Sequence, residues 1–183
     1  MKYQFCHLQK NAKKQKEAAQ ILTKTFNEIN KDAWPTYQSA MQEIYECIEE
    51  PNICLGICID EKLIGWVGLR PMYDKVWELH PMVISKEYQN RGIGRKLIKK
   101  LEELAREKGI IGIVLGTDDE TGSTSISNIE INSKNIWNHV KSIRNIKNHP
   151  FEFYQKCRYF IVGVIPDANG KGKPDIWMWK SLN

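Results

Sequence analysis

The chain has 183 residues, 42% of them hydrophobic and 27% charged, and a formal net charge of +5, so we expect a globular protein with a single domain over residues 1–183. No apolar run reaches the roughly 18 residues of a membrane span, and the N-terminus lacks the apolar core of a signal peptide, so we expect a cytoplasmic protein with no membrane partner. The lysines are spread along the chain rather than gathered in one run, which argues against nucleic acid as a partner.

Hydrophobic periodicity divides the chain into short strands and amphipathic helices. In the first part, a strand over residues 3–9 and helices over 13–29 and 38–48 precede a hairpin of strands 54–59 and 63–69. A strand over residues 76–84 then leads through a glycine-containing turn into a helix that ends at Gly109. In the second part, strands over residues 110–115, 160–165 and 175–180 accompany short helices over 135–143 and 150–157. The inward faces of the first two helices should include Ala18, Ile21, Leu22, Thr25, Phe26, Met41, Ile44, Tyr45 and Ile48.

The glycine-containing turn has the features of a phosphate cradle. Helix N-termini carry partial positive charge, yet Arg91, Arg95 and Lys96 flank this one, which costs stability unless an anion binds. Gly92 and Gly94 let a ligand approach the free backbone N–H groups. The alternative is an ordinary strand-to-helix turn with a solvated basic face.

The pattern Gln-x-x-Gly-x-Gly from Gln89 to Gly94 resembles the acetyl-CoA pyrophosphate loop of the GNAT N-acetyltransferases, whereas neither a P-loop nor a dinucleotide fingerprint fits. Further segments narrow the resemblance to the aminoglycoside 6′-N-acetyltransferases, which are bacterial resistance enzymes. These segments are residues 77–83, 115–119, 148–156, 161–170 and 173–178. Arg158 stands where that family often has glycine, so we expect its helix-to-strand turn to differ.

The resemblance implies an α/β (α+β) fold of the GNAT acyl-CoA N-acyltransferase type. Its central mixed, mostly antiparallel sheet is flanked by helices and has a splay between the two central strands. The implied enzyme transfers an acetyl group from acetyl-CoA to the 6′-amino group of an aminoglycoside by direct attack in a ternary complex, which confers antibiotic resistance. No metal is implied, and we expect a homodimer with the C-terminal strand as interface. The alternatives are acetylation of a polyamine or protein amine, and a catalytically silent CoA-binding sensor.

The implied cofactor site follows the strand over residues 76–84 and the glycine turn. Backbone groups of Met82, Val83 and Ile84 would pair with the pantetheine amides, and the Met82 N–H would polarise the thioester carbonyl. Backbone N–H groups of the turn would hold the pyrophosphate, namely those of Gln89, Asn90, Arg91, Gly92, Ile93, Gly94 and Arg95. Tyr154 is the candidate general acid for the departing thiolate.

A polycationic aminoglycoside needs local negative charge, for which Glu78, Asp118 and Asp119 are the candidates. Glu78 lies between Trp77 and Leu79, where a charge is costly unless it is paired. A substrate ammonium would pair it, and Glu78 could also accept the amine proton through water as a general base. The alternatives are a salt bridge to a lysine or arginine for Glu78, and turn capping for the two aspartates.

Further candidates are aromatic. Trp34 and Tyr73 match family positions that flank the aminoglycoside, with core or rim packing as the alternative. His80 follows Glu78 by two residues and is either a proton relay or a hydrogen-bonded core histidine.

The cysteines are odd in number and match no zinc-ligand spacing, so we expect reduced thiols and no metal site. They are Cys6, Cys47, Cys54, Cys58 and Cys157. Cys54 and Cys58 share a strand face by the period of two, which favours packing.

Overall fold

The computed structural model describes residues 2–28 and 32–183. By its internal contacts the chain divides into two compact units, residues 1–111 with Leu182 and residues 112–181 with Asn183. Each unit contains an antiparallel sheet with its own helices, which confirms the predicted α/β class. The single domain over residues 1–183 and the splay between central strands stay predictions.

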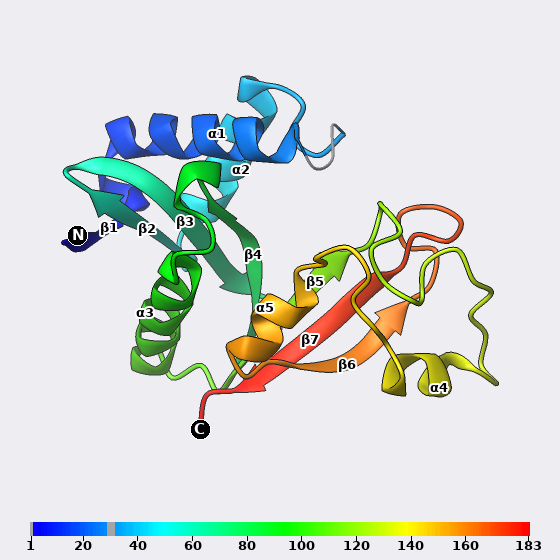
Figure 1. Cartoon of the computed structure of the whole chain (residues 1–183). Helices are drawn as coiled ribbons and strands as arrows, with labels where there is room; N and C mark the ends of the chain where they lie inside the picture. Colours follow the sequence, from blue (N-terminus) through cyan, green and yellow to red (C-terminus); the bar gives the residue numbers. More distant parts are fainter. Residues whose placement is uncertain (1, 29–31) are drawn as a thin grey trace. The chain divides into compact units, whose positions relative to one another are not determined.

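The first unit is an antiparallel sheet whose strands are neighbours in chain order. The strands are β1 (Tyr3–His7), β2 (Ile53–Ile59), β3 (Lys62–Pro71) and β4 (Val76–Ile84). Helices α1 (Ala12–Phe26) and α2 (Tyr37–Ile48) cover one face, and α3 (Ile93–Glu107) covers the other (Figure 1). Short 3-10 helices, η1 (Leu8–Lys10) and η2 (Lys86–Tyr88), follow β1 and β4.

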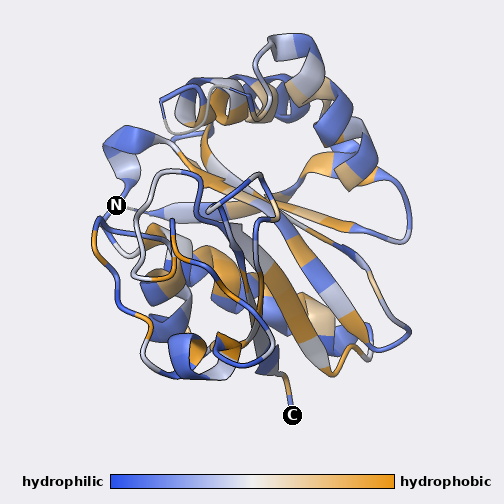
Figure 2. Ribbon diagram, turned by 90° about the vertical axis from the view of Figure 1, so that its right-hand side faces the viewer, coloured by the Kyte–Doolittle hydropathy of each residue, from blue (hydrophilic) through white to orange (hydrophobic). Residues whose placement is uncertain are grey.

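Trp66 of β3 lies in the core between this sheet and α1. Its side chain is fully buried, and its indole N–H donates to the Ala18 carbonyl at 3.1 Å. Every residue of β2 is buried, which explains why that strand is a continuous apolar run. Figure 2 shows hydrophobic residues recurring along the strands and hydrophilic residues on the outer faces of the helices. The core thus holds β3 and its neighbour β4 in place.

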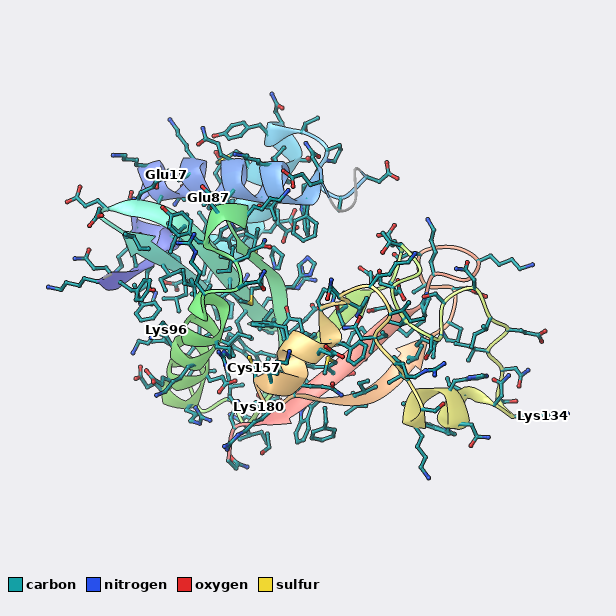
Figure 3. The ribbon with its side chains drawn as sticks, viewed as in Figure 1. Glu17, Glu87, Lys96, Lys134, Cys157 and Lys180 are labelled. Atoms are coloured by element: carbon teal, nitrogen blue, oxygen red, sulfur yellow. The ribbon has the colours of Figure 1, made fainter. Side chains whose placement is uncertain are left out.

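The second unit is an antiparallel sheet with the strand order β5-β7-β6. Its elements are β5 (Gly112–Asp118), α4 (Ile136–Lys141), α5 (Phe151–Lys156), β6 (Phe160–Ile165) and β7 (Asp175–Ser181). The Lys180 ammonium donates to the Cys157 carbonyl at 2.9 Å, where a cation complements the carbonyl end of α5 (Figure 3). This contact ties α5 to β7.

The predicted helices and strands are confirmed, with shifted ends. Residues 8–10 form η1 rather than the end of the first strand, and the strand predicted over 110–115 runs from Gly112 to Asp118 instead. The first helix ends at Phe26, and residues 29–31, which include the predicted end of that helix, lie outside the described residues.

The prediction that Tyr45 faces inward is wrong. Its side chain is 51% exposed, because the buried residues of α2 form a narrow stripe of Ala40, Ile44 and Cys47. In the described parts of the chain, each helix is too short or too polar to span a membrane.

Left-handed backbone marks the ends of two helices. Gly109 follows α3 with φ +75°, as expected for a glycine after a helix C-terminus. Arg158 follows α5 with φ +69°, so the turn that leads to β6 adopts the conformation that glycine favours.

Candidate functional site

The glycine turn forms an uncapped helix start. Gly92 is the N-cap of α3 with φ +76°, and Asn90 before it is also left-handed, with φ +58°. In α3, all of which the structure describes, no side chain caps the first turn and no acidic residue stands there. Arg91 and Arg95 are exposed beside these N–H groups. The arrangement is therefore open to an anion, as the sequence predicts.

Lys96 lies one turn into α3, with its ammonium 5.5 Å from the ring centroid of Tyr3 on β1 (Figure 3). It adds positive charge to the same helix start.

The Gln89 side chain stabilises the glycine turn. Its side-chain amide donates to the Ile84 carbonyl at 2.9 Å, at the end of β4. The Ser85 N–H donates to the Ile64 carbonyl on β3 at 2.8 Å. Because antiparallel strands alternate their hydrogen bonds, the N–H groups of Met82 and Ile84 point away from β3. Gln89 thus has a structural partner. The cofactor roles predicted for β4 depend on its backbone groups that point away from β3.

Three of the predicted cofactor residues have buried side chains. Val83, Ile84 and Ile93 are 3%, 9% and 1% exposed, so they belong to the core and offer a ligand their backbone alone.

Glu78 on β4 pairs with Arg70 on β3. Glu78 Oε2 lies 2.7 Å from Arg70 Nε, and the two residues face each other across the strands. The Glu78 side chain is 18% exposed and that of Arg70 is 39% exposed. The salt bridge that the sequence left as an alternative is therefore present, and one carboxylate oxygen is held by it.

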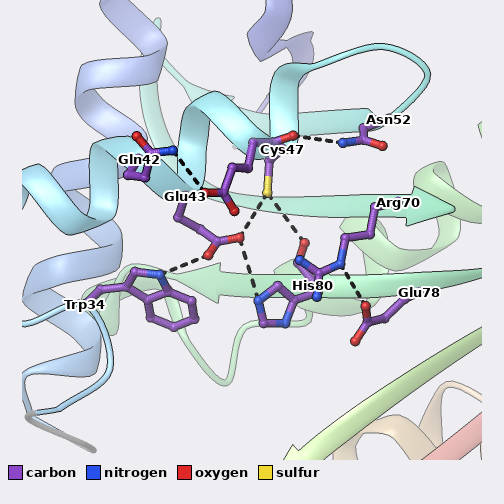
Figure 4. A network of polar contacts seen from close by, with 9 residues as sticks. Trp34, Gln42, Glu43, Cys47, Asn52, Arg70, Glu78 and His80 are labelled. Atoms are coloured by element: carbon purple, nitrogen blue, oxygen red, sulfur yellow. Dashed lines mark hydrogen bonds and ion pairs between the residues drawn. The ribbon is translucent and has the colours of Figure 1, made fainter. Parts of the chain in front are cut away.

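A second carboxylate, Glu43 of α2, lies next to this pair and was not predicted (Figure 4). Its Oε2 accepts the Trp34 indole N–H at 3.1 Å, and its Oε1 accepts from the Cys47 thiol at 3.4 Å. His80 Nε2 lies 3.6 Å from Oε1. Burial alone would raise the pKa of Glu43, but His80, Trp34 and Cys47 together hold it below its ordinary value. The signal in the sequence is a charge at helical spacing with Ala40 and Cys47 on the inward face of α2.

Trp34 has φ +50° and packs edge-on against Phe26, with ring centroids 4.7 Å apart. Its ring also lies 5.9 Å from the His80 ring, so these two predicted residues are brought together. Tyr73 lies between β3 and β4 and is 65% exposed, with its N–H bonded to the Val76 carbonyl at 2.9 Å. Tyr73 is therefore a surface residue rather than a core one.

In the second unit, Asp119 is buried and serves its own loop. It is 1% exposed, and its carboxylate accepts N–H groups of Ser123 and Thr124 at 2.7 Å each, together with the Ser127 hydroxyl. Burial alone would raise the pKa of Asp119, but these hydrogen bonds hold it below its ordinary value. The turn-capping alternative thus describes Asp119. Asp118 instead accepts from the Asn169 side-chain amide.

His149 fixes the start of α5 and was not predicted. It is 4% exposed, and the Phe151 N–H donates to His149 Nδ1 at 3.3 Å. The ring proton is therefore on Nε2, which donates to the Asp118 carbonyl at 3.0 Å. Burial lowers the pKa of His149, which matches a neutral ring.

Tyr154 of α5 packs its ring against Phe153 and Tyr159, with centroids 5.1 Å and 5.9 Å away. Burial, and to a lesser degree Cys157, raises the pKa of the Tyr154 phenol above its ordinary value. The hydroxyl therefore keeps its proton at neutral pH, as a general acid must.

The cysteines behave as packing residues. Cys54 and Cys58 are 0% and 4% exposed in the core, and the Cys58 sulfur lies 3.6 Å from that of Cys6. Among the residues that the structure describes, no group of three or more His, Cys, Asp or Glu side chains could hold a metal ion.

Comparison with known proteins gives the family. The model of the acetyltransferase (GNAT) family matches residues 16–126. The fold is similar to that of an aminoglycoside 6′-N-acetyltransferase solved with coenzyme A, with a TM-score of 0.90, 33% identity, and coverage of 98% of this chain and 97% of the other. It is also similar to the aminoglycoside 6′-N-acetyltransferase of Enterococcus faecium, with a TM-score of 0.88, 34% identity, and coverage of 100% and 98%.

The curated relatives match over shorter stretches. Probable N-acetyltransferase 14 of Xenopus tropicalis is 35% identical over 74 residues, which are 40% of this chain and 36% of that protein. The chain thus spans little more than a third of that relative's own length.

Proposed function

The chain belongs to the acetyltransferase (GNAT) family, and from this we propose that it transfers an acetyl group from acetyl-CoA to the 6′-amino group of an aminoglycoside. The observation that carries the proposal is the start of α3, where uncapped N–H groups and Arg91 and Arg95 favour a phosphate-bearing donor. The acceptor is inferred from the likeness over the whole chain to two aminoglycoside 6′-N-acetyltransferases.

The donor would be held mainly by backbone. The N–H groups from Asn90 to Arg95 bind the pyrophosphate, and the exposed cations add charge. The Gln89 N–H, which was also predicted for this role, already donates to the Lys86 carbonyl at 3.2 Å. The N–H groups of Met82 and Ile84 point away from β3, which suits pairing with the pantetheine amides and with the thioester oxygen. Since the Ile84 carbonyl already accepts from Gln89, the Ile84 N–H is the group left to bind acetyl-CoA.

The acceptor amine must be neutral when it attacks the thioester carbon. We propose that the ammonium form gives its proton through water to the carboxylate of Glu78, which is fixed by Arg70 and is still partly exposed. The C–N bond forms as the C–S bond breaks, and the departing thiolate takes the Tyr154 proton. The acetylated nitrogen then releases its excess proton through water, which restores the Tyr154 phenol. Because the pKa of that phenol is raised, this transfer is uphill and its contribution to the rate is modest.

Substrate contacts are assigned to Trp34, Tyr73, Glu78 and Asp118. For Asp119 we propose an indirect role, because both of its carboxylate oxygens accept bonds from its own loop.

We also propose that the protein is a cytoplasmic homodimer and that its reaction confers antibiotic resistance. The C-terminal strand β7 is paired on both sides, so an edge interface falls to β6 instead. Phe160, Val162 and Ile165 of β6 are 53%, 42% and 49% exposed, and an apolar edge strand of this kind favours pairing. Light scattering should report the mass of two chains.

The function is tested by thiol release. Purified protein is mixed with acetyl-CoA and kanamycin or tobramycin, and free CoA is measured with a thiol reagent. Release that saturates with both substrates is expected. Release with spermidine alone would favour a polyamine acceptor, and acetyl-CoA binding without release for any acceptor would favour a silent sensor.

A further inference from the structure

Glu43 is a largely buried carboxylate that the transfer chemistry above leaves unused. Its side chain is 11% exposed on the inward face of α2. A carboxylate is costly to bury unless polar groups compensate it, so its partners show what it does.

Two of those partners come from segments outside α2, and the third, Cys47, lies on α2 itself. Oε2 accepts the indole N–H of Trp34, in the segment before α2, at 3.1 Å. Oε1 lies 3.6 Å from Nε2 of His80, on β4. One carboxylate thus ties the segment before α2 to the strand that carries Glu78 (Figure 4).

The backbone conformation of Trp34 requires contacts that hold it. Its φ of +50° is uncommon for a bulky residue and persists where surrounding contacts hold it. The contacts are the Glu43 hydrogen bond on one edge and the Phe26 ring, with centroids 4.7 Å apart. Loss of the hydrogen bond should leave the indole free to turn.

We propose that Glu43 is a positioning residue for the acceptor, because it holds the indole of Trp34 and the imidazole of His80 in the orientation that a cationic amino sugar meets. The inference rests on the proposed function and adds to it a residue that touches neither substrate. Glu43 also adds a second carboxylate to the cluster that contains Glu78, which favours a cationic acceptor.

The kinetic test compares Glu43→Gln with Glu46→Gln. Glu46 lies on the same helix and is exposed, and its carboxylate accepts from Gln42 at 3.0 Å. Glu43→Gln should raise the KM for the aminoglycoside about tenfold, as expected for loss of a charged hydrogen bond. The KM for acetyl-CoA should stay within about twofold, and Glu46→Gln should behave as the wild type.

A double-mutant cycle shows whether the effect passes through Trp34. Trp34→Phe removes the indole N–H and keeps an aromatic ring. If Glu43 acts by holding that N–H, the two substitutions together should cost little more than either alone. Additive effects would overturn the assignment. Should Glu43→Gln fail to fold, Trp34→Phe alone must raise the aminoglycoside KM to a similar degree.

A spectroscopic readout separates this inference from the proposed function. The Trp34 indole N–H proton resonance is assigned by its absence in Trp34→Phe, and Glu43→Gln should shift it upfield. If the wild type releases no thiol with any acceptor, the proposed function fails, and the resonance still decides whether Glu43 holds Trp34. A resonance and an aminoglycoside KM that both match the wild type in Glu43→Gln would overturn the inference.

Discussion

At the scale of single residues, Glu78 combines a structural contact with a proposed chemical one. Its ion pair with Arg70 is partly exposed, and such pairs are worth about 0–1 kcal/mol. A positioned general base contributes roughly 10²–10⁴-fold to a rate. The two roles therefore predict very different effects of one substitution.

Glu78→Gln should lower kcat at least about 100-fold while the melting temperature changes little. Steady-state kinetics and thermal unfolding are measured side by side. Glu103→Gln, which removes another ion pair by breaking the contact with Lys100 on α3, is the control and should change neither quantity. If Glu78→Gln has the kinetics of the wild type, Glu78 has no part in proton transfer.

Asp119→Asn should destabilise the protein by about 1–3 kcal/mol, because an amide offers one acceptor oxygen where the carboxylate satisfies two buried N–H groups. The folded pKa of Asp119 is lowered, so its stabilisation is fully present above the unfolded pKa of about 3.9. It is lost as the pH falls through the lower folded value. The difference in melting temperature should thus be clear at neutral pH and shrink in strong acid.

An unchanged melting temperature with a raised aminoglycoside KM would restore Asp119 as a substrate contact. That outcome would show that the loop from Ser123 to Ser127 does not depend on this carboxylate.

At the scale of elements, α3 provides two glycines with the same backbone conformation and different surroundings. Gly92 at its start has φ +76°, and a Cβ there would approach just the Arg95 guanidinium, at 3.8 Å. Gly109 at its end has φ +75° and open space around it. A side chain at either position has a similar backbone cost of about 1–2 kcal/mol.

Gly92→Leu should therefore weaken acetyl-CoA binding about tenfold or more, since it also closes the approach to the N–H groups of α3. Gly109→Leu should bind acetyl-CoA as the wild type does. Titration calorimetry measures both. Equal affinities for the two variants would place the donor phosphates elsewhere.

The turn after α5 contains a residue whose replacement should stabilise the protein. Arg158 is exposed with φ +69°, and a left-handed backbone costs a residue with a Cβ about 1–2 kcal/mol. Arg158→Gly removes this cost and should raise the free energy of unfolding. The gain should be up to about 1 kcal/mol, because the greater freedom of glycine in the unfolded chain offsets part of it. Denaturant titration tests this, and a variant less stable than the wild type would show that the arginine side chain has a stabilising contact.

At the scale of the whole molecule, the sequence alone predicts the features that neighbouring residues determine. The start of α3 follows from Gly92 and the cations around it, because helix ends depend on neighbouring residues. Glu43 could not be assigned in the same way, since its partners Trp34 and His80 lie outside its own helix. The contacts of Asp119 could not be predicted for a related reason, because the N–H groups that donate to it lie in a loop whose conformation has no periodic signal.

The central claim is acetyl transfer to a 6′-amine, and a matched pair of acceptors tests it most directly. Neomycin and paromomycin differ in having an amino or a hydroxyl group at the 6′ position. With acetyl-CoA and the purified protein, we predict release of CoA thiol with neomycin and release at background level with paromomycin. Equal release with both, or none with neomycin, would contradict the account.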